Sequence, residues 1–247
     1  MLRYEETIKF QSVARTHAGD VRERNEDRFL ERADVGLWAV ADGMGGHRHG
    51  EVASGLLVDG LAEIQGFATP RAALDAVLAS IQGVNQELMR RARLVPGHVV
   101  IGSTVVVLIA HGEHFACLWA GDSRAYLLRD RQLKQLTNDH SVVQRLIDHG
   151  QLARTDARSH HRSNVITRAV GITQNVELDG CHSTLKLGDT FLLCSDGLSN
   201  MIDDDEICGH LANDSLETAA DNLLAQSLQR GARDDVTIVL VRATAKK

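Results

Sequence analysis

Four strongly apolar runs in this chain each have an aspartate at one end, and this pattern constrains the fold more than any other. Asp42 ends LWAVA, Asp122 ends FACLWAG, Asp196 ends FLLCS, and Asp234 precedes VTIVLV. Short apolar runs of this kind are typical of buried strands. Because the strands of one sheet bring such ends together, we expect the four carboxylates to converge.

Two interpretations of these aspartates remain open from spacing alone. Asp-Gly and Gly-Asp are common turn dipeptides. The chain has others without special context, at Gly19-Asp20, Asp59-Gly60, Asp179-Gly180 and Gly188-Asp189. Converging carboxylates would instead repel each other and take up protons unless cations offset their charge. Carboxylate oxygens, with a backbone carbonyl such as that of Gly43, are the ligands that magnesium and manganese prefer.

Segment order favours a layered α+β fold. With 43% hydrophobic and 24% charged residues over 247 positions, the chain has ample apolar material for a core, which excludes a mainly disordered protein. We expect strands at 7–15, 27–32, 37–41, 102–110, 114–120, 124–129, 190–194 and 236–242, and helices at 50–65, 70–93, 141–150 and 216–229. The expected helices do not alternate with strands, which favours antiparallel sheets over a parallel βαβ fold.

Charge and hydropathy exclude several classes of partner. The net charge of −6 argues against nucleic acid, because binding to the phosphate backbone needs a positive field. The most apolar stretch, Val99 to Ala110, is too short to cross a membrane, and the N-terminus lacks the apolar block of a signal peptide. The four cysteines show no CxxC spacing. We therefore expect a cytoplasmic protein that binds neither nucleic acid nor membrane.

Eight motifs occur in one order along the chain. They are RERNEDRF (22–29), ADGMGGHRHGEVAS (41–54), GSTVVV (102–107), AGDSRAYLLRD (120–130), LTNDHS (136–141), NVITRAVG (164–171), LLCSDGLSN (192–200) and DDVTIVLV (234–241). Together they resemble the bacterial branch of the metal-dependent protein serine/threonine phosphatases, the type 2C or PPM family, from about Thr16 to Val241. The resemblance implies a four-layer αββα sandwich of two antiparallel sheets flanked by helices. It also implies a single phosphatase domain over 1–247, with a flap at about 137–171.

The resemblance also implies a metal centre with two manganese or magnesium ions. Asp42 would bridge them, the Gly43 carbonyl would bind one, and Asp196 and Asp234 would be the remaining direct ligands. Asp122, together with Asp196, would hold the third ion that bacterial members often carry.

Other matching residues imply roles around that centre. Arg22 would clamp the substrate phosphate, and with Asp42 and Asp196 it makes up the expected catalytic set. Glu26 and Asp27 would hold metal-bound waters. His47 and His161, the latter in the flap, are further candidates on the substrate side.

Two positions depart from the family pattern. Met44 stands where animal members carry a histidine that is a candidate acid for the leaving group. Asp235 stands where an asparagine is more usual. Its extra carboxylate would either compete for metal or raise the cation affinity of the site.

The function implied is hydrolysis of phosphoserine and phosphothreonine on proteins by direct attack of a metal-bridging hydroxide. The expected counterpart is a eukaryotic-like serine/threonine kinase, with that kinase and forkhead-associated proteins among the partners. Free-standing architecture is expected, since the chain shows no tail or anchor. The alternatives are a non-catalytic relative that binds phosphoproteins as a regulatory module, and a specialised hydrolase with one dedicated substrate.

Overall fold

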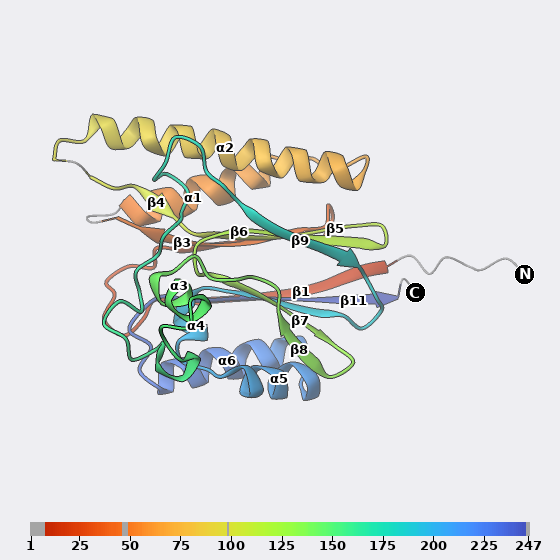
Figure 1. The fold of residues 1–247 in the computed structure, drawn as a ribbon. Coiled ribbons are helices and arrows are strands. Elements are labelled where there is room, and N and C mark those ends of the chain that lie inside the picture. The colour runs from red at the N-terminus through yellow and green to blue at the C-terminus, as the bar shows by residue number, and fades with distance from the viewer. Residues whose placement is uncertain (1–7, 46–48, 98, 246–247) are drawn as a thin grey trace, which may run out of the picture.

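Two antiparallel sheets form the centre of the molecule in the computed structural model, which describes residues 8–45, 49–97 and 99–245 (Figure 1). The first sheet has five strands, in the order β1 (Ile8–His17), β11 (Val236–Ala245), β10 (Thr190–Cys194), β7 (Arg124–Arg129) and β8 (Gln132–Gln135). The second has the order β2 (Asp27–Arg32), β3 (Leu37–Met44), β5 (Val105–His111), β6 (His114–Ala120) and β9 (Asp179–Thr184), and β4 (Gly102–Ser103) pairs with β3.

Helices cover the outer face of each sheet, which gives the expected αββα layers (Figure 1). Helices α1 (His49–Ala62) and α2 (Pro70–Leu94) lie on the second sheet, and α5 (Asp204–Asn213) and α6 (Leu216–Gln229) lie on the first. Helices α3 (Val142–Asp148) and α4 (Asp196–Ser199) and a 3-10 turn (Arg154–Asp156) lie at the end of the sandwich opposite the described chain ends. No helix within the described ranges combines the length and apolarity needed to cross a membrane.

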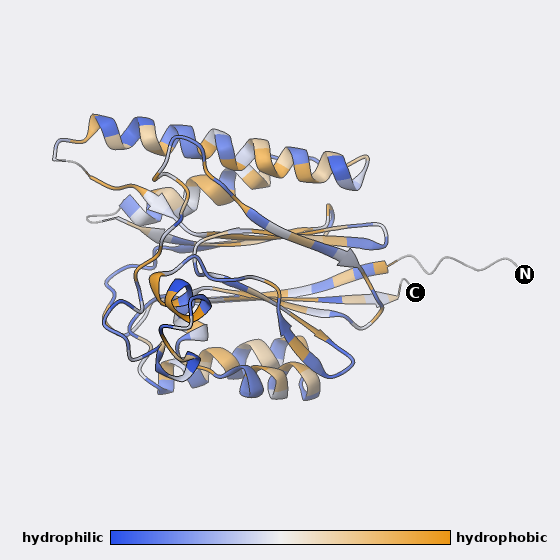
Figure 2. Ribbon diagram, in the orientation of Figure 1, coloured by the Kyte–Doolittle hydropathy of each residue, from blue (hydrophilic) through white to orange (hydrophobic). Residues whose placement is uncertain are grey.

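Three apolar clusters join the four layers, and alternation along the strands builds them. On β3, Leu37 and Ala39 face the α1–α2 layer, while Trp38 and Val40 face the other sheet. The third cluster fills the space between the first sheet and α5–α6 around Leu192. Figure 2 shows the apolar residues along the sheets and on the helices that cover them. Each large side chain removed from water in this way contributes about 1.5–3 kcal/mol.

Local signals set the helix starts. Thr69 caps α2 by accepting a hydrogen bond from the Ala72 N–H, and Pro70 occupies the first turn. Ser141 and Ser215 cap α3 and α6 in the same way. A side-chain oxygen at this position satisfies one of the backbone donors that a helix start leaves free.

Most expected elements are confirmed, and the differences are local. The strands at 27–32, 114–120, 124–129 and 190–194 and the helix at 216–229 have the expected bounds. The expected strand at 102–110 is instead two strands interrupted at Thr104, whose N–H donates to the Asp42 carbonyl at 2.8 Å. Strands β8 and β9 and helix α5 were not expected, because their polar sequences lack clear apolar alternation.

Candidate active site

The aspartates that end the apolar strands meet at one end of the sandwich. Asp42 lies near the end of β3, Asp122 lies between β6 and β7, Asp196 begins α4 after β10, and Asp234 lies just before β11. All four line one cavity of about 400 Å³. The expectation that one sheet supplies them is wrong: Asp42 comes from the second sheet and Asp196 and Asp234 from the first, because the strand ends of both stacked sheets face the same cavity.

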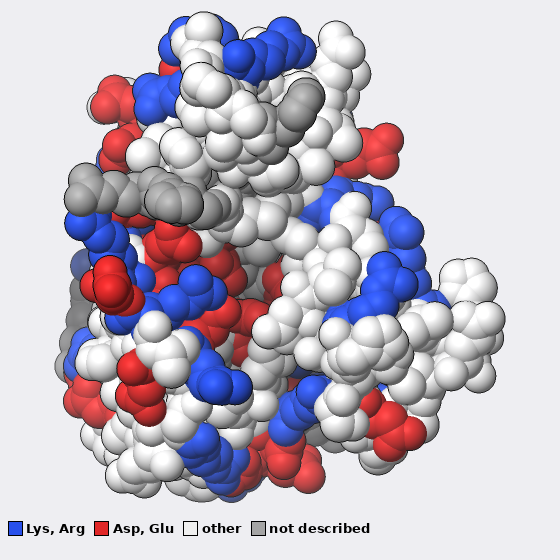
Figure 3. Space-filling model, turned by 90° about the vertical axis from the view of Figure 1, so that its left-hand side faces the viewer, with Lys and Arg blue, Asp and Glu red and all other residues white. Residues whose placement is uncertain are grey.

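The remaining lining residues come from the loop before β2, the β3–α1 connection and the segment expected to be a flap. They are Arg22, Glu26, Gly43, Met44, Gly45, Thr104, Asn164 and Ile166. Figure 3 looks onto this end, where acidic atoms lie in a hollow with basic side chains around it. The cavity therefore has an acidic floor and a partly basic border.

Burial and mutual repulsion dominate the electrostatics of the floor. Burial, and then the neighbouring carboxylates, raises the pKa of Asp42 and of Asp196 well above the usual value. Burial and then Asp139 raise the pKa of Asp122 to about 6. Burial also raises the pKa of Asp27 to about 7, and the charges of Asp235 and Asp234 act in the same direction. Carboxylates in such surroundings stabilise a bound cation.

Buried carboxylate oxygens without a hydrogen-bond partner also indicate a cation site. Asp27 is the direct antiparallel partner of Asp42 and is 1% exposed, yet neither of its carboxylate oxygens has a hydrogen-bond partner. Asp196 Oδ1 is also buried without a partner. Buried polar atoms are normally paired, so these oxygens fit a site that takes up hard divalent cations and their waters.

The carboxylates do not form a close cluster. Within residues 8–45, 49–97 and 99–245, no three histidine, cysteine or acidic side chains are grouped closely enough to hold one ion by themselves. Magnesium-like ions keep several waters and need only one or two carboxylates each. The spread of acids around an open cavity is therefore consistent with water-rich ion binding, and not with an enclosed histidine or cysteine site.

Close backbone contacts fix the Asp42–Gly43 turn. The Asp42 N–H donates to Thr104 Oγ1 at 3.2 Å, and the Gly43 N–H donates to the Glu26 carbonyl at 3.2 Å. A Cβ on Gly43 would lie 2.1 Å from the Gly50 carbonyl oxygen. Only glycine fits here, so the sequence Asp-Gly at this point serves packing between β3 and the start of α1.

Arg22 lies at the border of the cavity and forms an ion pair with Asp234, one of the expected metal ligands. Its Nη2 is 2.7 Å from Asp234 Oδ1, and its Nη1 is 4.0 Å from Glu26 Oε2. Arg22 also lines a second cavity of about 540 Å³, which shares Asn164, Asp196 and Asp234 with the first. The guanidinium therefore stands where the acidic floor opens into a larger recess.

Asp235 does not face the cavity. Its Oδ2 accepts a hydrogen bond from the Glu26 N–H at 2.7 Å, and its Oδ1 accepts one from the Gly19 N–H at 3.4 Å. The side chain is 3% exposed. Both oxygens thus bind backbone of the loop that carries Arg22, and Asp235 acts as a support for that loop.

The segment 137–171 reaches the cavity through Asn164 and Ile166. Arg158 anchors it, because its guanidinium donates to the carbonyls of Ser199 and Ile202. His161 is exposed, and its ring lies at a tilt of 36° to that of His160 with centroids 4.4 Å apart. It is not among the residues that line the cavity.

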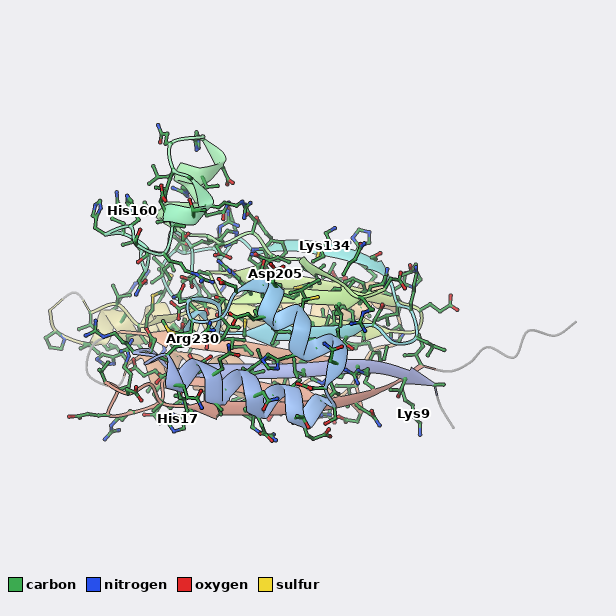
Figure 4. The ribbon with its side chains drawn as sticks, turned by 90° about the horizontal axis from the view of Figure 1, so that it is seen from below. Lys9, His17, Lys134, His160, Asp205 and Arg230 are labelled. Carbon is green, nitrogen blue, oxygen red and sulfur yellow. The ribbon has the colours of Figure 1, made fainter. Side chains whose placement is uncertain are left out.

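Figure 4 shows His160 on the part of this segment that projects beyond the sheets. His47, the other expected histidine, lies outside the described residues.

Two supporting residues were missed in the sequence. Asn200 donates from Nδ2 to Asp196 Oδ2 at 3.1 Å, one helical turn away. Thr104 binds the Asp42 backbone, and its hydroxyl also contacts the Ser123 hydroxyl at 2.7 Å. The four-residue spacing in SDGLSN was a usable signal for Asn200, whereas nothing local to Thr104 predicts its contact with Asp42.

Comparison with known proteins shows which family has this sequence and fold. A family model described as protein phosphatase 2C matches residues 16–233, a range that contains Asp42, Asp122 and Asp196 and ends one residue before Asp234. This chain belongs to the protein phosphatase 2C family. The phosphatase is 36% identical over 235 residues to the serine/threonine phosphatase stp of Listeria monocytogenes, which covers 92% of this chain and 93% of that protein. It is thus a serine/threonine protein phosphatase.

Solved structures agree with this assignment. PppA, described as a key regulatory component of T6SS in Pseudomonas aeruginosa, is 40% identical to the phosphatase with a TM-score of 0.88, and the match covers 95% of this chain and 98% of that one. The catalytic domain of PstP in complex with two manganese ions is 33% identical with a TM-score of 0.87, and the match covers 96% and 100%. The expected fold class is confirmed.

Proposed function

We propose that this phosphatase removes phosphate from phosphoserine and phosphothreonine on proteins in a reaction that requires manganese or magnesium. The residues that would hold two ions are Asp42, the Gly43 carbonyl, Asp196 and Asp234, and Asp122 with Asp196 would hold a third. The observation that carries the proposal is the convergence of four carboxylates on one cavity, with unpaired oxygens on Asp27 and Asp196. The relative solved with two manganese ions supports the same count.

The bound ions would supply a water of lowered pKa and would neutralise charge on the phosphoryl group. The chain's own contribution begins with Arg22, which can bind two phosphoryl oxygens through its planar guanidinium. Asp234 orients that guanidinium through the 2.7 Å contact. Asn200 orients Asp196 through its amide. Glu26 and Asp27 present acceptor oxygens to waters at the floor of the cavity.

The lining supports direct attack by water without a covalent enzyme intermediate. Among the described lining residues, Thr104 has the only hydroxyl, and it is already engaged by the Asp42 N–H and the Ser123 hydroxyl. No cysteine or histidine is present among those described lining residues to serve as a nucleophile or its base. The non-catalytic alternative is not favoured, because every expected ligand is present.

The reaction removes the group that a protein kinase adds. In this proposal the phosphatase opposes a eukaryotic-like serine/threonine kinase, and forkhead-associated proteins are among its substrates. Both follow from the family resemblance.

A direct test uses p-nitrophenyl phosphate and peptides carrying phosphothreonine or phosphotyrosine, each with manganese, magnesium or chelator. We expect phosphate release only with metal, and release from phosphothreonine in preference to phosphotyrosine. Asp196→Asn should lower turnover more than about 100-fold while its circular dichroism stays unchanged, since one ligand and its Asn200 contact are altered. Absence of hydrolysis with every metal would overturn the proposal.

A further inference from the structure

Two free cysteines are direct partners across neighbouring strands, away from the acidic cavity. Cys117 on β6 pairs with Cys181 on β9 in the antiparallel register. In the same register the Leu185 N–H donates to the Glu113 carbonyl at 2.9 Å. Hydrogen-bonded pairs recur at every second residue, so Cys117 and Cys181 also form such a pair, with Cα atoms about 5.5 Å apart.

The two side chains point to the same face of the sheet, because they are directly opposed. Each thiol shifts the pKa of the other, as expected for neighbouring groups. Disulfides usually connect Cα atoms 4.4–6.8 Å apart, so a bond between these sulfurs requires no change of register. The register therefore places the two cysteines opposite each other, and a small approach of the edge strand β9 would bring their Cβ atoms from about 5.5 Å to the roughly 4 Å that a disulfide requires.

The two thiols differ in access and acidity. Strand β9 is the edge of the second sheet, and Cys181 is partly exposed, whereas Cys117 is fully buried. The neighbouring Cys117 thiol, and then the charge of Lys134 on β8 (labelled in Figure 4), lowers the pKa of Cys181 to about 7 against the effect of burial. The same contact raises the pKa of Cys117. Cys181 is therefore the thiolate that an oxidant meets first.

We propose that Cys117 and Cys181 form a reversible disulfide when the protein meets a peroxide. The Cys181 thiolate attacks one peroxide oxygen, the O–O bond breaks, hydroxide leaves, and Cys181 becomes a sulfenic acid. The Cys117 sulfur then attacks the Cys181 sulfur. The S–S bond forms, the S–O bond breaks, and the thiol proton leaves with the hydroxyl as water. Two thiols are oxidised and one peroxide is reduced, and a dithiol reductant reverses the step.

The bond would close a loop that contains Asp122 and the whole segment 137–171. Two residues before Cys181, Asp179 contacts His140 at 3.1 Å and also binds Arg168, and both belong to that segment. Closing a loop of about 65 residues restricts the unfolded chain, which stabilises the fold. Oxidation should therefore raise the midpoint of thermal unfolding by several degrees.

The test exposes the full-length protein to hydrogen peroxide and then alkylates the remaining thiols under denaturing conditions. We expect free thiols to fall from four to two and mass spectrometry to find a peptide linking Cys117 to Cys181. Dithiothreitol should restore all four thiols. Cys208→Ser, which removes the other partly exposed cysteine, is the matched control and should still form the bond.

Two further variants separate the steps. Cys181→Ser should abolish the bond, and Cys117→Ser should leave a sulfenic acid on Cys181 that dimedone traps. If Cys117→Ser does not fold because the hydroxyl is buried, the Cys117→Ala variant is used in its place. The proposal would be overturned if no thiol were lost, if the linked peptide contained Cys208, or if Cys181 of the unmodified protein became a sulfinic acid.

Discussion

The guanidinium of Arg22 and the carboxylate of Asp234 form a 2.7 Å ion pair at the border of the acidic cavity. A residue expected to bind phosphate is therefore held by a residue expected to bind metal. The Arg22 side chain is 43% exposed, so its outer nitrogen remains open to a substrate in the adjoining recess. The pair links the position of the phosphate group to the floor of the site.

Replacing Arg22 should weaken phosphopeptide turnover without removing metal binding. Arg22→Ala should lower kcat/KM by about 10- to 100-fold, because a charge-assisted hydrogen bond to phosphate contributes about 1.5–3 kcal/mol. Arg22→Lys should recover only part of the loss, since an ammonium cannot make the forked contact. Steady-state kinetics and manganese titration by calorimetry check both points. Equal loss of manganese affinity and kcat/KM would show that Arg22 acts through the ligands instead.

Stability of the metal-free protein should depend on pH in a direction set by Asp27. Its pKa is near 3.8 when unfolded and is raised to about 7 in the fold, so the folded state binds the proton more tightly. Well below pH 3.8, Asp27 does not lower the free energy of unfolding. As pH rises from there to about 7, it destabilises the fold increasingly. With chelator, the unfolding midpoint of Asp27→Asn should exceed that of the unmodified protein at pH 7.5.

Manganese should remove most of that difference, because the cation offsets the acidic charge. The comparison at pH 3 is the internal control, since Asp27 is then mostly protonated in both the folded and the unfolded chain. An Asp27→Asn variant that is less stable than the unmodified protein at pH 7.5 under chelation would contradict the assignment of a buried, unpaired charge.

The site was more predictable than its surroundings. The sequence indicates the four site aspartates because each lies at one end of an apolar strand, and strand ends can be predicted from sequence. They are Asp42, Asp122, Asp196 and Asp234. Which sheet each strand joins depends on long-range pairing, so the assignment of all four to one sheet was wrong. Strand β9, with its sequence DGCHST, pairs through its backbone at a sheet edge and needs no apolar pattern.

Asp235 illustrates the other limit. The sequence showed an aspartate beside a ligand and left its role open. In the structure, its carboxylate accepts hydrogen bonds from the Gly19 and Glu26 N–H groups, which are distant in sequence.

We expect Asp235→Asn to retain activity within about threefold, because an amide oxygen still accepts from the Glu26 N–H. Asp235→Ala should lose stability by about 1–3 kcal/mol, because it leaves that N–H unpaired. Urea unfolding and phosphatase assays distinguish the two, and loss of activity in Asp235→Asn alone would point to a direct role in metal binding.

The last prediction concerns the contact between β3 and the start of α1. In Gly43→Ala the new methyl group would lie 2.1 Å from the Gly50 carbonyl oxygen and 2.7 Å from the Glu26 carbonyl oxygen, so backbone must move. Because Gly43 adjoins Asp42, that movement displaces the carboxylate, and we expect at least about tenfold weaker manganese binding and a lower unfolding midpoint. Gly55→Ala is the matched control within α1, since nothing lies within 4 Å of its added methyl group. That variant should be slightly stabilised, by about 0.5–1 kcal/mol, with unchanged manganese affinity. Similar manganese affinity in the two variants would show that the Asp42–Gly43 turn does not hold the ions.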